Sequence, residues 1–331
     1  MSLRIFSFVL LISISAPAQM NLKCTLQFDE NPYNHNMHIA SDGRFYYTIN
    51  GGQTSGKIGK FKLDGTLVGF YPIELDGRGL CYNNADQHFY VSTYAGNVAR
   101  IDDIENGKFT ILFNKIMQTE QCSFAISCDG KTFYDFSKGE MKVHDMKTGA
   151  VIKSMSGFKY GVGPQNANFG GDEAVAVDIA HIYTWDSGKR EVYVYDLNGK
   201  YQKTYSLDFG DNGHSLSITN GFLFVSRDGN YGVGTWYGYP LQSSGSCRSP
   251  MDIDFFPNPV AGSFTIGGEI DSIQVMNAAG DIVMRMDSTK TAFGKGVKYH
   301  SVDLVDFAPG DYSIVIYDIE GGETFENVTI E

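Results

Sequence analysis

Short segments in which apolar and polar residues alternate recur along the middle of this 331-residue chain. Alternation with a period of two is the signature of a half-buried β-strand. The segments come in groups, each with a strand of small residues, a polar turn, an aromatic-rich strand and a third strand that ends near a glycine. The pattern predicts an all-β domain over residues 19–242.

These groups form an internal repeat between residues 36 and 241. The aromatic-rich second strands begin at intervals of 44, 44, 49 and 41 residues, at Phe45, Phe89, Phe133, Ile182 and Leu223. Four-stranded units of this length are typical of β-propeller blades. We therefore expect a five-bladed β-propeller, or a six-bladed one if the insertion at residues 157–172 hides a further copy. A β-sandwich is the competing architecture, but it does not require such a repeat.

The fifth copy lacks a fourth strand, because it stops at Leu241 before a Ser-rich stretch at residues 243–250, which we interpret as a linker. An alternating segment at Asn21–Phe28 precedes the first copy. We expect it to complete the last blade, so that the ring has no exposed edge strand. In the order of their strands and turns, the repeats loosely resemble the tryptophan-poor YVTN and quinoprotein-like propellers.

The N-terminus has the pattern of an export signal. Arg4 precedes the apolar run Ile5–Ile14, which is too short to span a bilayer, and an Ala-Pro-Ala sequence ends at Ala18. This predicts a signal peptide over residues 1–18, and no later run is long enough to be a transmembrane helix. We expect the mature protein to lie outside the cell or on the outer-membrane surface.

Composition limits the classes of partner and the number of disulfides that we expect. The net charge of −12 and the absence of a Lys/Arg cluster argue against nucleic acid. Five cysteines in an exported chain permit two disulfides. Cys24 lies on the predicted closing strand, and Cys247 lies just beyond the neighbouring strand of the fifth copy. We therefore expect a disulfide between Cys24 and Cys247 that keeps the ring closed.

The last eighty or so residues carry several spaced motifs. An aromatic-Pro-Asn-Pro stretch at Phe255–Pro259 is followed by a strand, a strand-turn-strand element at Ile273–Val283 and a late motif at Phe307–Tyr312. This segment resembles the type A C-terminal sorting domain of type IX secretion cargo in Gram-negative bacteria. The motif residues that carry the resemblance are Pro257, Asn258, Pro259, Gly280, Pro309 and Gly310.

The resemblance implies that residues 251–331 form a small antiparallel β-sandwich recognised by the type IX secretion machinery. It also implies that the tail is either cleaved, with release of the protein, or attached to the cell surface. Alternating apolar residues between glycine and proline turns predict the same sandwich without the family. An ordinary adhesion-type β module is the alternative interpretation.

Ligand sites in propellers usually lie where the first strand of each blade begins, at the mouth of the central channel. Polar residues occupy or adjoin those positions, and the predicted ligand-binding set is Asn36, Arg78, Glu120, Glu173 and His214. Such a set suits a small polar ligand, a surface glycan or a protein partner. The alternative is that these side chains only face water in the channel.

Enzymatic activity is the second functional hypothesis. Glycoside hydrolysis needs two carboxyl groups that face one bond, one protonated and one ionised. Glu173, or its neighbour Asp172, together with Glu120, could supply them at the entrances of adjacent blades. Cys122 or Cys128 with His214 is a weaker combination, since an exported thiol without a surrounding motif is usually paired or inert.

No metal site or cofactor is predicted. The histidines His35 and His38 are three residues apart at a strand entrance, where their side chains point apart. Residues 208–213 lack a calcium-loop pattern, because Gly210 stands where an oxygen ligand is needed. The glycine-rich segments at residues 161–164 and 232–234 precede no helix that could hold a phosphate.

Overall fold

The computed structural model describes residues 19–31, 34–53, 56–162, 171–241, 263–267, 270–277, 281–287, 299–303, 306–318 and 323–330. Every regular element in these ranges is a β-strand. The all-β fold predicted from the alternation is therefore confirmed. No helix that could cross a membrane occurs in the described part of the chain. The signal peptide, Cys247, the linker and motif residues Pro257, Asn258, Pro259 and Gly280 lie outside the described ranges.

The described residues before 242 form five sheets. Their first strands contain small residues and are β3 (His35–Ser41), β7 (Gly77–Asn83), β11 (Phe124–Ile126), β15 (Val175–Val177) and β19 (Ser217–Thr219). The second strands are β4 (Tyr46–Gly51), β8 (His88–Thr93), β12 (Thr132–Ser137), β16 (His181–Asp186) and β20 (Phe222–Arg227). The third strands are β5 (Gly56–Phe61), β9 (Val98–Asp103), β13 (Glu140–Asp145), β17 (Glu191–Asp196) and β21 (Gly234–Pro240).

The outermost strands of the first four sheets are β6 (Leu67–Ile73), β10 (Lys108–Phe113), β14 (Val151–Ser156) and β18 (Tyr201–Ser206). In the fifth sheet this place is taken by β2 (Leu26–Glu30), which pairs antiparallel with β21. The predicted closing segment thus does pair with the last copy. It begins earlier in a separate short strand, β1 (Gln19–Asn21), which pairs in parallel with β18 of the fourth sheet.

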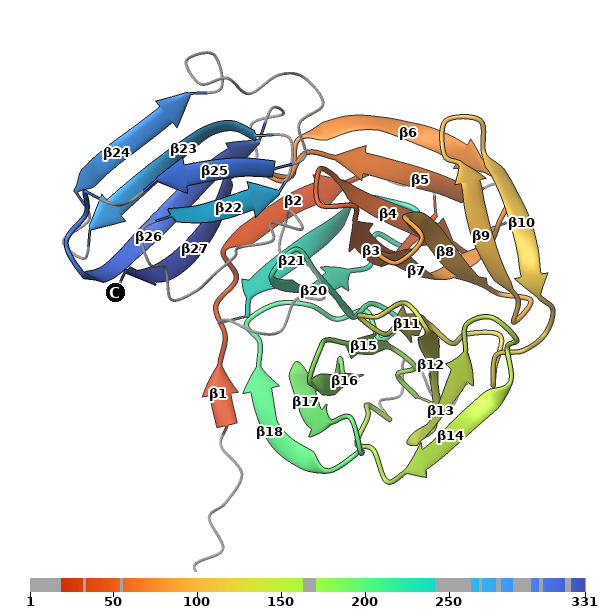
Figure 1. Ribbon diagram of the computed structural model, residues 1–331. Coiled ribbons are helices and arrows are strands. Elements are labelled where there is room, and N and C mark those ends of the chain that lie inside the picture. Colours follow the sequence, from red (N-terminus) through yellow and green to blue (C-terminus); the bar gives the residue numbers. More distant parts are fainter. Residues whose placement is uncertain are drawn as a thin grey trace, which may run out of the picture.

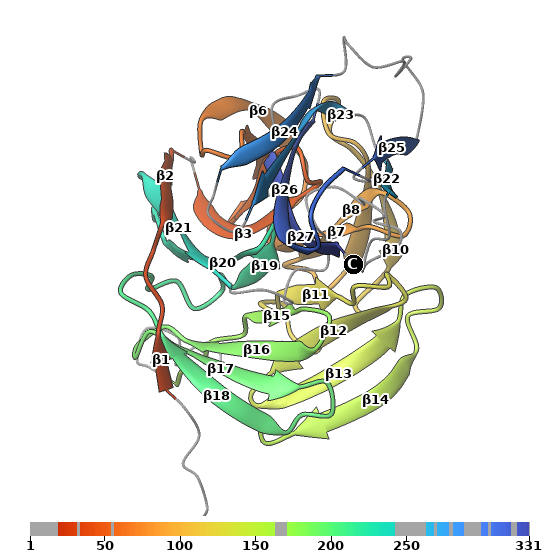
Figure 2. The same ribbon diagram turned by 60° about the vertical axis from the view of Figure 1, so that its left-hand side comes forward.

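The sheets follow one another in a closed order. First strands contact each other from β3 through β7, β11, β15 and β19, and β19 contacts β3 again. Each neighbouring pair of sheets also shares a buried apolar cluster. The radial arrangement is visible in Figure 1, and Figure 2 shows the sheets from a second direction. These observations describe a propeller-like fold, whereas a sandwich would stack its sheets face to face.

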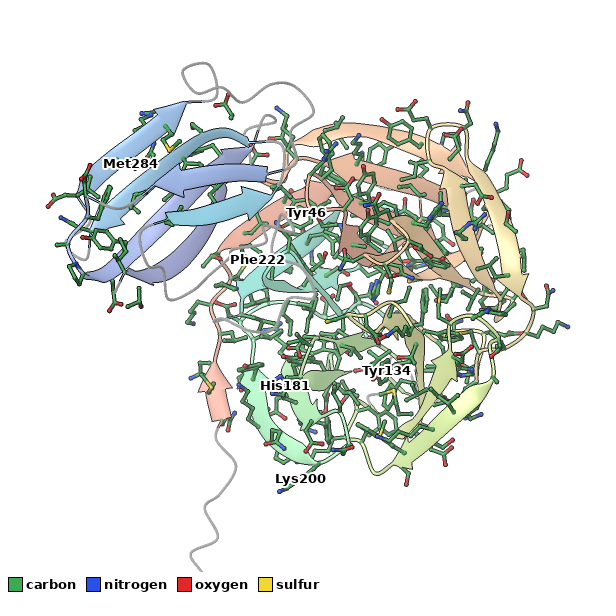
Figure 3. The ribbon with its side chains drawn as sticks, in the orientation of Figure 1. Tyr46, Tyr134, His181, Lys200, Phe222 and Met284 are labelled. Atoms are coloured by element: carbon green, nitrogen blue, oxygen red, sulfur yellow. The ribbon has the colours of Figure 1, made fainter. Side chains whose placement is uncertain are left out.

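Aromatic residues fill the spaces between sheets, as the aromatic-rich second strands suggest. Tyr46 on β4 is fully buried and lies edge-on to Phe224 of β20, with ring centroids 5.1 Å apart. Lys200, in the turn before β18, is exposed at the outer end of its sheet (Figure 3). The apolar core of this region therefore lies between adjacent sheets.

The hairpins between first and second strands share one hydrogen bond. Tyr47 donates its hydroxyl to Asp42 at 3.1 Å, and Tyr183 donates to Asp178 at 2.5 Å. Each aspartate also accepts backbone N–H groups of its own turn. The same spacing in two copies indicates that they are structural repeats.

The insertion at residues 157–172 adds no strand in its described parts, residues 157–162 and 171–172. The predicted disulfide is wrong, because Cys24 is a free thiol. Its Sγ donates to the carbonyl of Leu26 at 3.3 Å, in the segment between β1 and β2. Cys81 and Cys122 are also free, and Cys128 is disulfide-bonded.

The described part of the tail contains two sheets. A four-stranded sheet has the order β24 (Ile282–Asp287), β23 (Ile270–Asn277), β26 (Gly310–Asp318) and β27 (Glu323–Ile330), and β22 (Ser263–Gly267) pairs with β25 (Tyr299–Asp303). Val302 of the smaller sheet belongs to the same buried cluster as Ile273 and Ile314 of the larger one. The two sheets therefore share one core. Pro309 and Gly310 of the late motif lie at the start of β26.

Candidate functional site

A cavity of about 560 Å³ opens where the first strands begin, and we call it the mouth cavity. This volume lies in the range of small-molecule sites. Its described lining consists of His35, Met37, Gly52, Arg78, Gln121, Asp211, Asn212, Gly213, His214, Asp228 and Asn230. Of the predicted ligand-binding set, Arg78 and His214 thus belong to the lining, whereas Asn36, Glu120 and Glu173 do not.

Arg78 is fixed in the wall of the mouth cavity. It is 4% exposed, and its guanidinium forms an ion pair with Asp76. Its Nε donates to Oε1 of Gln121 at 2.8 Å, and the ring of Tyr94 lies 4.8 Å from the guanidinium carbon. A Cβ at Gly51 would lie 2.3 Å from the Arg78 side chain, so glycine is needed there. The guanidinium is therefore held in place, and its charge is already balanced by Asp76.

His35 and Asp228 form a second fixed pair. Nδ1 of His35 lies 2.6 Å from Oδ2 of Asp228, and the other carboxylate oxygen accepts the backbone N–H of Asn230 at 3.1 Å. The hydrogen bond to Asp228 raises the pKa of His35 above its ordinary value, against the effect of partial burial. Protonation of His35 is thus easier than for a free imidazole, and Asp228 would balance the charge of the protonated ring.

His214 differs from His35 in its electrostatic surroundings. Burial lowers the pKa of His214 to about 4, and the positive charge of Arg78 acts in the same direction. Its backbone N–H donates to Oδ1 of Asn212 at 3.0 Å, which fixes the loop that carries it. At neutral pH the imidazole of His214 is therefore neutral, whereas the pKa of His35 is shifted in the opposite direction, toward the protonated form.

Two exposed tyrosines adjoin the mouth cavity. Tyr94 is 41% exposed and packs on Arg78, and Tyr231 is 55% exposed and lies edge-on to His35 at 5.1 Å between ring centroids. Asn230 and Tyr231 both have left-handed backbone conformations, with φ of 43° and 68°. Such conformations cost free energy and are concentrated at functional sites.

Asn36 supports the loop at the cavity instead of lining it. The side chain is completely buried, and its Oδ1 accepts the backbone N–H of Gly229 at 3.0 Å. Its backbone carbonyl accepts a hydrogen bond from Nδ2 of Asn212 at 2.8 Å. A Cβ at Gly234 would lie 2.4 Å from the Asn36 side chain. Asn36 therefore positions both the loop of Asp228 and the loop of His214.

The two glutamates of the hydrolase hypothesis do not meet at this cavity. Glu120 is an exposed turn residue, and Glu173 is fully buried. Glu173 accepts hydrogen bonds from Thr119 at 2.5 Å and Ser137 at 3.0 Å, so its carboxylate connects neighbouring sheets. Burial raises the pKa of Glu173, and these two hydrogen bonds oppose the rise. The structure does not bring this pair together as a catalytic pair in the mouth cavity.

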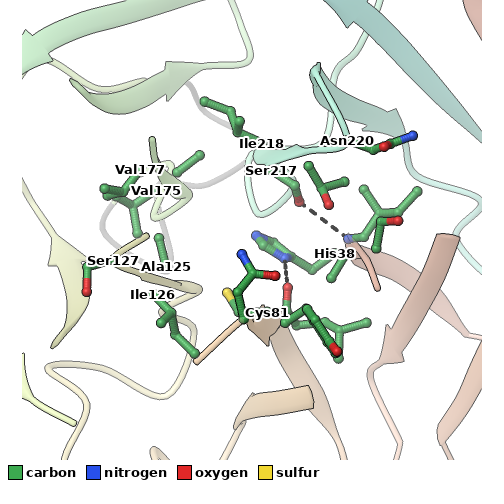
Figure 4. Close-up of a pocket in the computed structure, with 18 of the residues that line it drawn as sticks. His38, Cys81, Ala125, Ile126, Ser127, Val175, Val177, Ser217, Ile218 and Asn220 are labelled. Carbon is green, nitrogen blue, oxygen red and sulfur yellow. Dashed lines mark hydrogen bonds between the residues drawn. The ribbon is translucent and has the colours of Figure 1, made fainter. Parts of the chain in front are cut away.

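The other end of the first strands encloses a smaller cavity of about 60 Å³, lined by His38, Cys81, Val175 and their neighbours (Figure 4). His38 bridges two carbonyl oxygens, with Nδ1 2.7 Å from Leu80 and Nε2 2.8 Å from Leu216. Burial lowers the pKa of His38 to about 4, although both carbonyls favour the protonated ring. His38 thus links three neighbouring sheets at the centre.

Sequence reasoning missed the partners that complete the site. Asp228 is 193 residues from His35, and Gln121 is 43 residues from Arg78. The available signal is the aromatic, glycine-rich stretch that begins at Asn230. Among the described residues, no group of three His, Cys, Asp or Glu side chains is placed to hold a metal ion.

No family model matches the chain, and no curated protein matches it. Among solved structures, it is similar to glutaminyl cyclase from Myxococcus xanthus, with 10% identity and a TM-score of 0.50 over 67% of this chain and 97% of that one. AztD from Citrobacter koseri matches with 18% identity and a TM-score of 0.33 over 52% and 48%. At 10% identity the first likeness concerns the fold alone, and it supports a propeller-like fold.

Proposed function

We propose that this protein is an exported five-bladed β-propeller that binds a neutral sugar in the mouth cavity. The observation that carries the proposal is the pairing of charges in the cavity wall. Arg78 is matched by Asp76 and His35 by Asp228, so neither cation is left to attract an anion. What remains is the carboxylate of Asp211 and a set of polar groups, which suit a ligand rich in hydroxyl groups.

The two tyrosines support the same ligand class. An aromatic face packs against the C–H side of a sugar ring, while fixed amides and charged groups bind its hydroxyls. Tyr94 and Tyr231 are exposed aromatic residues that contact side chains of the cavity lining. Gln121 and Asn230 supply amide groups in the same lining.

Binding is tested with the mature chain by saturation-transfer NMR and calorimetry against glucose, galactose, mannose and N-acetylglucosamine. We expect binding that is lost in the Tyr231→Asn variant, since asparagine tolerates the left-handed backbone but removes the ring. Ile152→Ala is the matched control, because Ile152 is similarly exposed on β14, an outermost strand. Absence of binding to every sugar, or equal loss in both variants, would reject this ligand class.

We also propose that the tail directs export by the type IX route, as its motifs suggest. In this proposal residues 251–331 form an antiparallel β-sandwich that the secretion machinery recognises, after cleavage of residues 1–18. The five shared clusters between neighbouring sheets support a cargo domain that is complete before residue 242. Deletion of residues 251–331 is expected to retain the protein in the periplasm. Normal appearance of the truncated protein outside the cell would contradict the routing.

A further inference from the structure

We propose that the mouth cavity catalyses the interconversion of the α and β anomers of a reducing sugar, with His35 as proton donor, Asp228 as the residue that positions it, and His214 as proton acceptor. This inference rests on the proposed sugar-binding function. It adds a reaction that requires only one proton donor and one proton acceptor.

The His35–Asp228 pair has the geometry of an oriented acid. The 2.6 Å hydrogen bond uses Nδ1, and among the described residues no hydrogen bond occupies Nε2. Gly52 lies against the same ring, where a Cβ would come within 2.7 Å of Cδ2. The imidazole is therefore held from two sides, and Nε2 remains for a ligand in the cavity that His35 lines.

His214 is the complementary base. It lines the same cavity, and its loop is anchored through Asn212 to the carbonyl of Asn36. The charged groups around the two imidazoles are Arg78, Asp76, Asp211 and Asp228, and the pKa values of the two rings move in opposite directions. Two titratable groups whose environments separate their pKa values are a recognised arrangement for acid–base catalysis.

The described lining offers a proton donor and a proton acceptor but no hydroxyl or thiol nucleophile. The described lining residues include no serine, threonine or cysteine that could act as a hydroxyl or thiol nucleophile. Covalent catalysis commonly uses such a group next to a base. Ring opening of a hemiacetal needs no nucleophile other than the hydroxyl groups of the sugar itself.

The step balances within the sugar and the two histidines. His214 takes the proton of the anomeric hydroxyl, the C1–O1 bond becomes a carbonyl, and the bond between C1 and the ring oxygen breaks with its electron pair moving to that oxygen. His35 gives its proton to the ring oxygen. After rotation about the C1–C2 bond, the reverse step closes the ring on the other face of C1 and returns both histidines to their starting states.

The test measures anomer exchange by polarimetry on fresh α-glucose and by NMR exchange on the four sugars, using the mature full chain. We expect a rate above buffer that is proportional to protein concentration. His35→Asn and His214→Phe should each reduce this rate about 100-fold or more, the usual contribution of general acid–base catalysis. The matched control is His88→Asn, since His88 is an exposed histidine beside Asp86, away from the cavity.

A second measurement separates catalysis from misfolding. The rate of the wild-type chain should fall on the acid side as His214 gains a proton and on the alkaline side as His35 loses one. If His35→Asn and His214→Phe lose no more of the exchange rate than His88→Asn does, with sugar binding intact, this inference is overturned and the proposed function stands. Absence of both binding and exchange would overturn both.

Discussion

The indole N–H of Trp236 donates to Oε2 of Glu30 at 2.6 Å, across 206 residues of chain. Oε1 of the same carboxylate accepts from Thr48 at 2.8 Å and Asn50 at 3.2 Å. Glu30 lies on β2, Trp236 on β21, and the other two donors on β4 of the first sheet. One buried carboxylate therefore joins the closing strand, the last sheet and the first sheet.

Glu30→Ala is expected to destabilise the protein by about 3 kcal/mol, because three buried donors lose their acceptor. Urea denaturation followed by tryptophan fluorescence measures the loss. Glu105→Ala, at an exposed turn, is the control and should change stability by less than about 0.5 kcal/mol. Equal midpoints for the two variants would show that the Glu30 network does not stabilise ring closure.

Two deletions of different length test the role of the N-terminal segment. Removing residues 19–30 should expose the edge of β21 and cause aggregation, since an unpaired edge strand can recruit another chain. Removing residues 19–21 removes only the three-residue parallel pairing with β18 and should leave a monomer. Size-exclusion chromatography distinguishes these outcomes, and a monomeric long deletion would contradict the role of β2.

Much of this closure could be predicted from sequence, because it depends on local alternation and on counting strands. Of the predicted segment Asn21–Phe28, only Leu26–Phe28 pairs with the last sheet. Residues 22–25 separate β1 from β2, and β2 extends to Glu30. The site was less predictable. Position at a strand entrance identified Arg78 and His214 but could not tell that Glu173 turns between sheets, because burial depends on the neighbouring sheet.

Asn36 illustrates the same limit, since its position predicted a ligand contact and its side chain instead holds Gly229. Asn36→Ala should weaken sugar binding about tenfold, corresponding to about 1.4 kcal/mol, because the loop of Asp228 loses its anchor. Calorimetry measures affinity, and amide exchange at Gly229 should become faster. Asn198→Ala, in an exposed turn, should alter neither. Unchanged exchange at Gly229 would show that the anchor is not needed.

Acid should destabilise the folded protein through His38. Its pKa is about 4 in the folded protein and about 6.5 when unfolded, so the unfolded state binds the proton first. The stabilising contribution is complete above about pH 6.5 and is lost as pH falls toward 4, by about 3 kcal/mol. Urea midpoints at pH 7 and pH 4.5 test this. The His38→Gln variant should show a smaller drop, with the remainder due to His214; an identical drop would exclude His38 as a cause.

The late motif of the tail is held by a local contact that can be removed. Tyr312 donates its hydroxyl to the carbonyl of Ala308 at 2.9 Å, and its ring lies edge-on to Phe307 at 5.6 Å. These contacts bracket Pro309 and Gly310. If the export machinery recognises this turn, Tyr312→Ala should reduce the exported fraction of the protein, while the domain before residue 242 remains folded. Arg285→Ala, an exposed change on β24, should export normally. Equal export of both variants, measured by fractionating the producing cells, would mean that recognition uses another part of the tail.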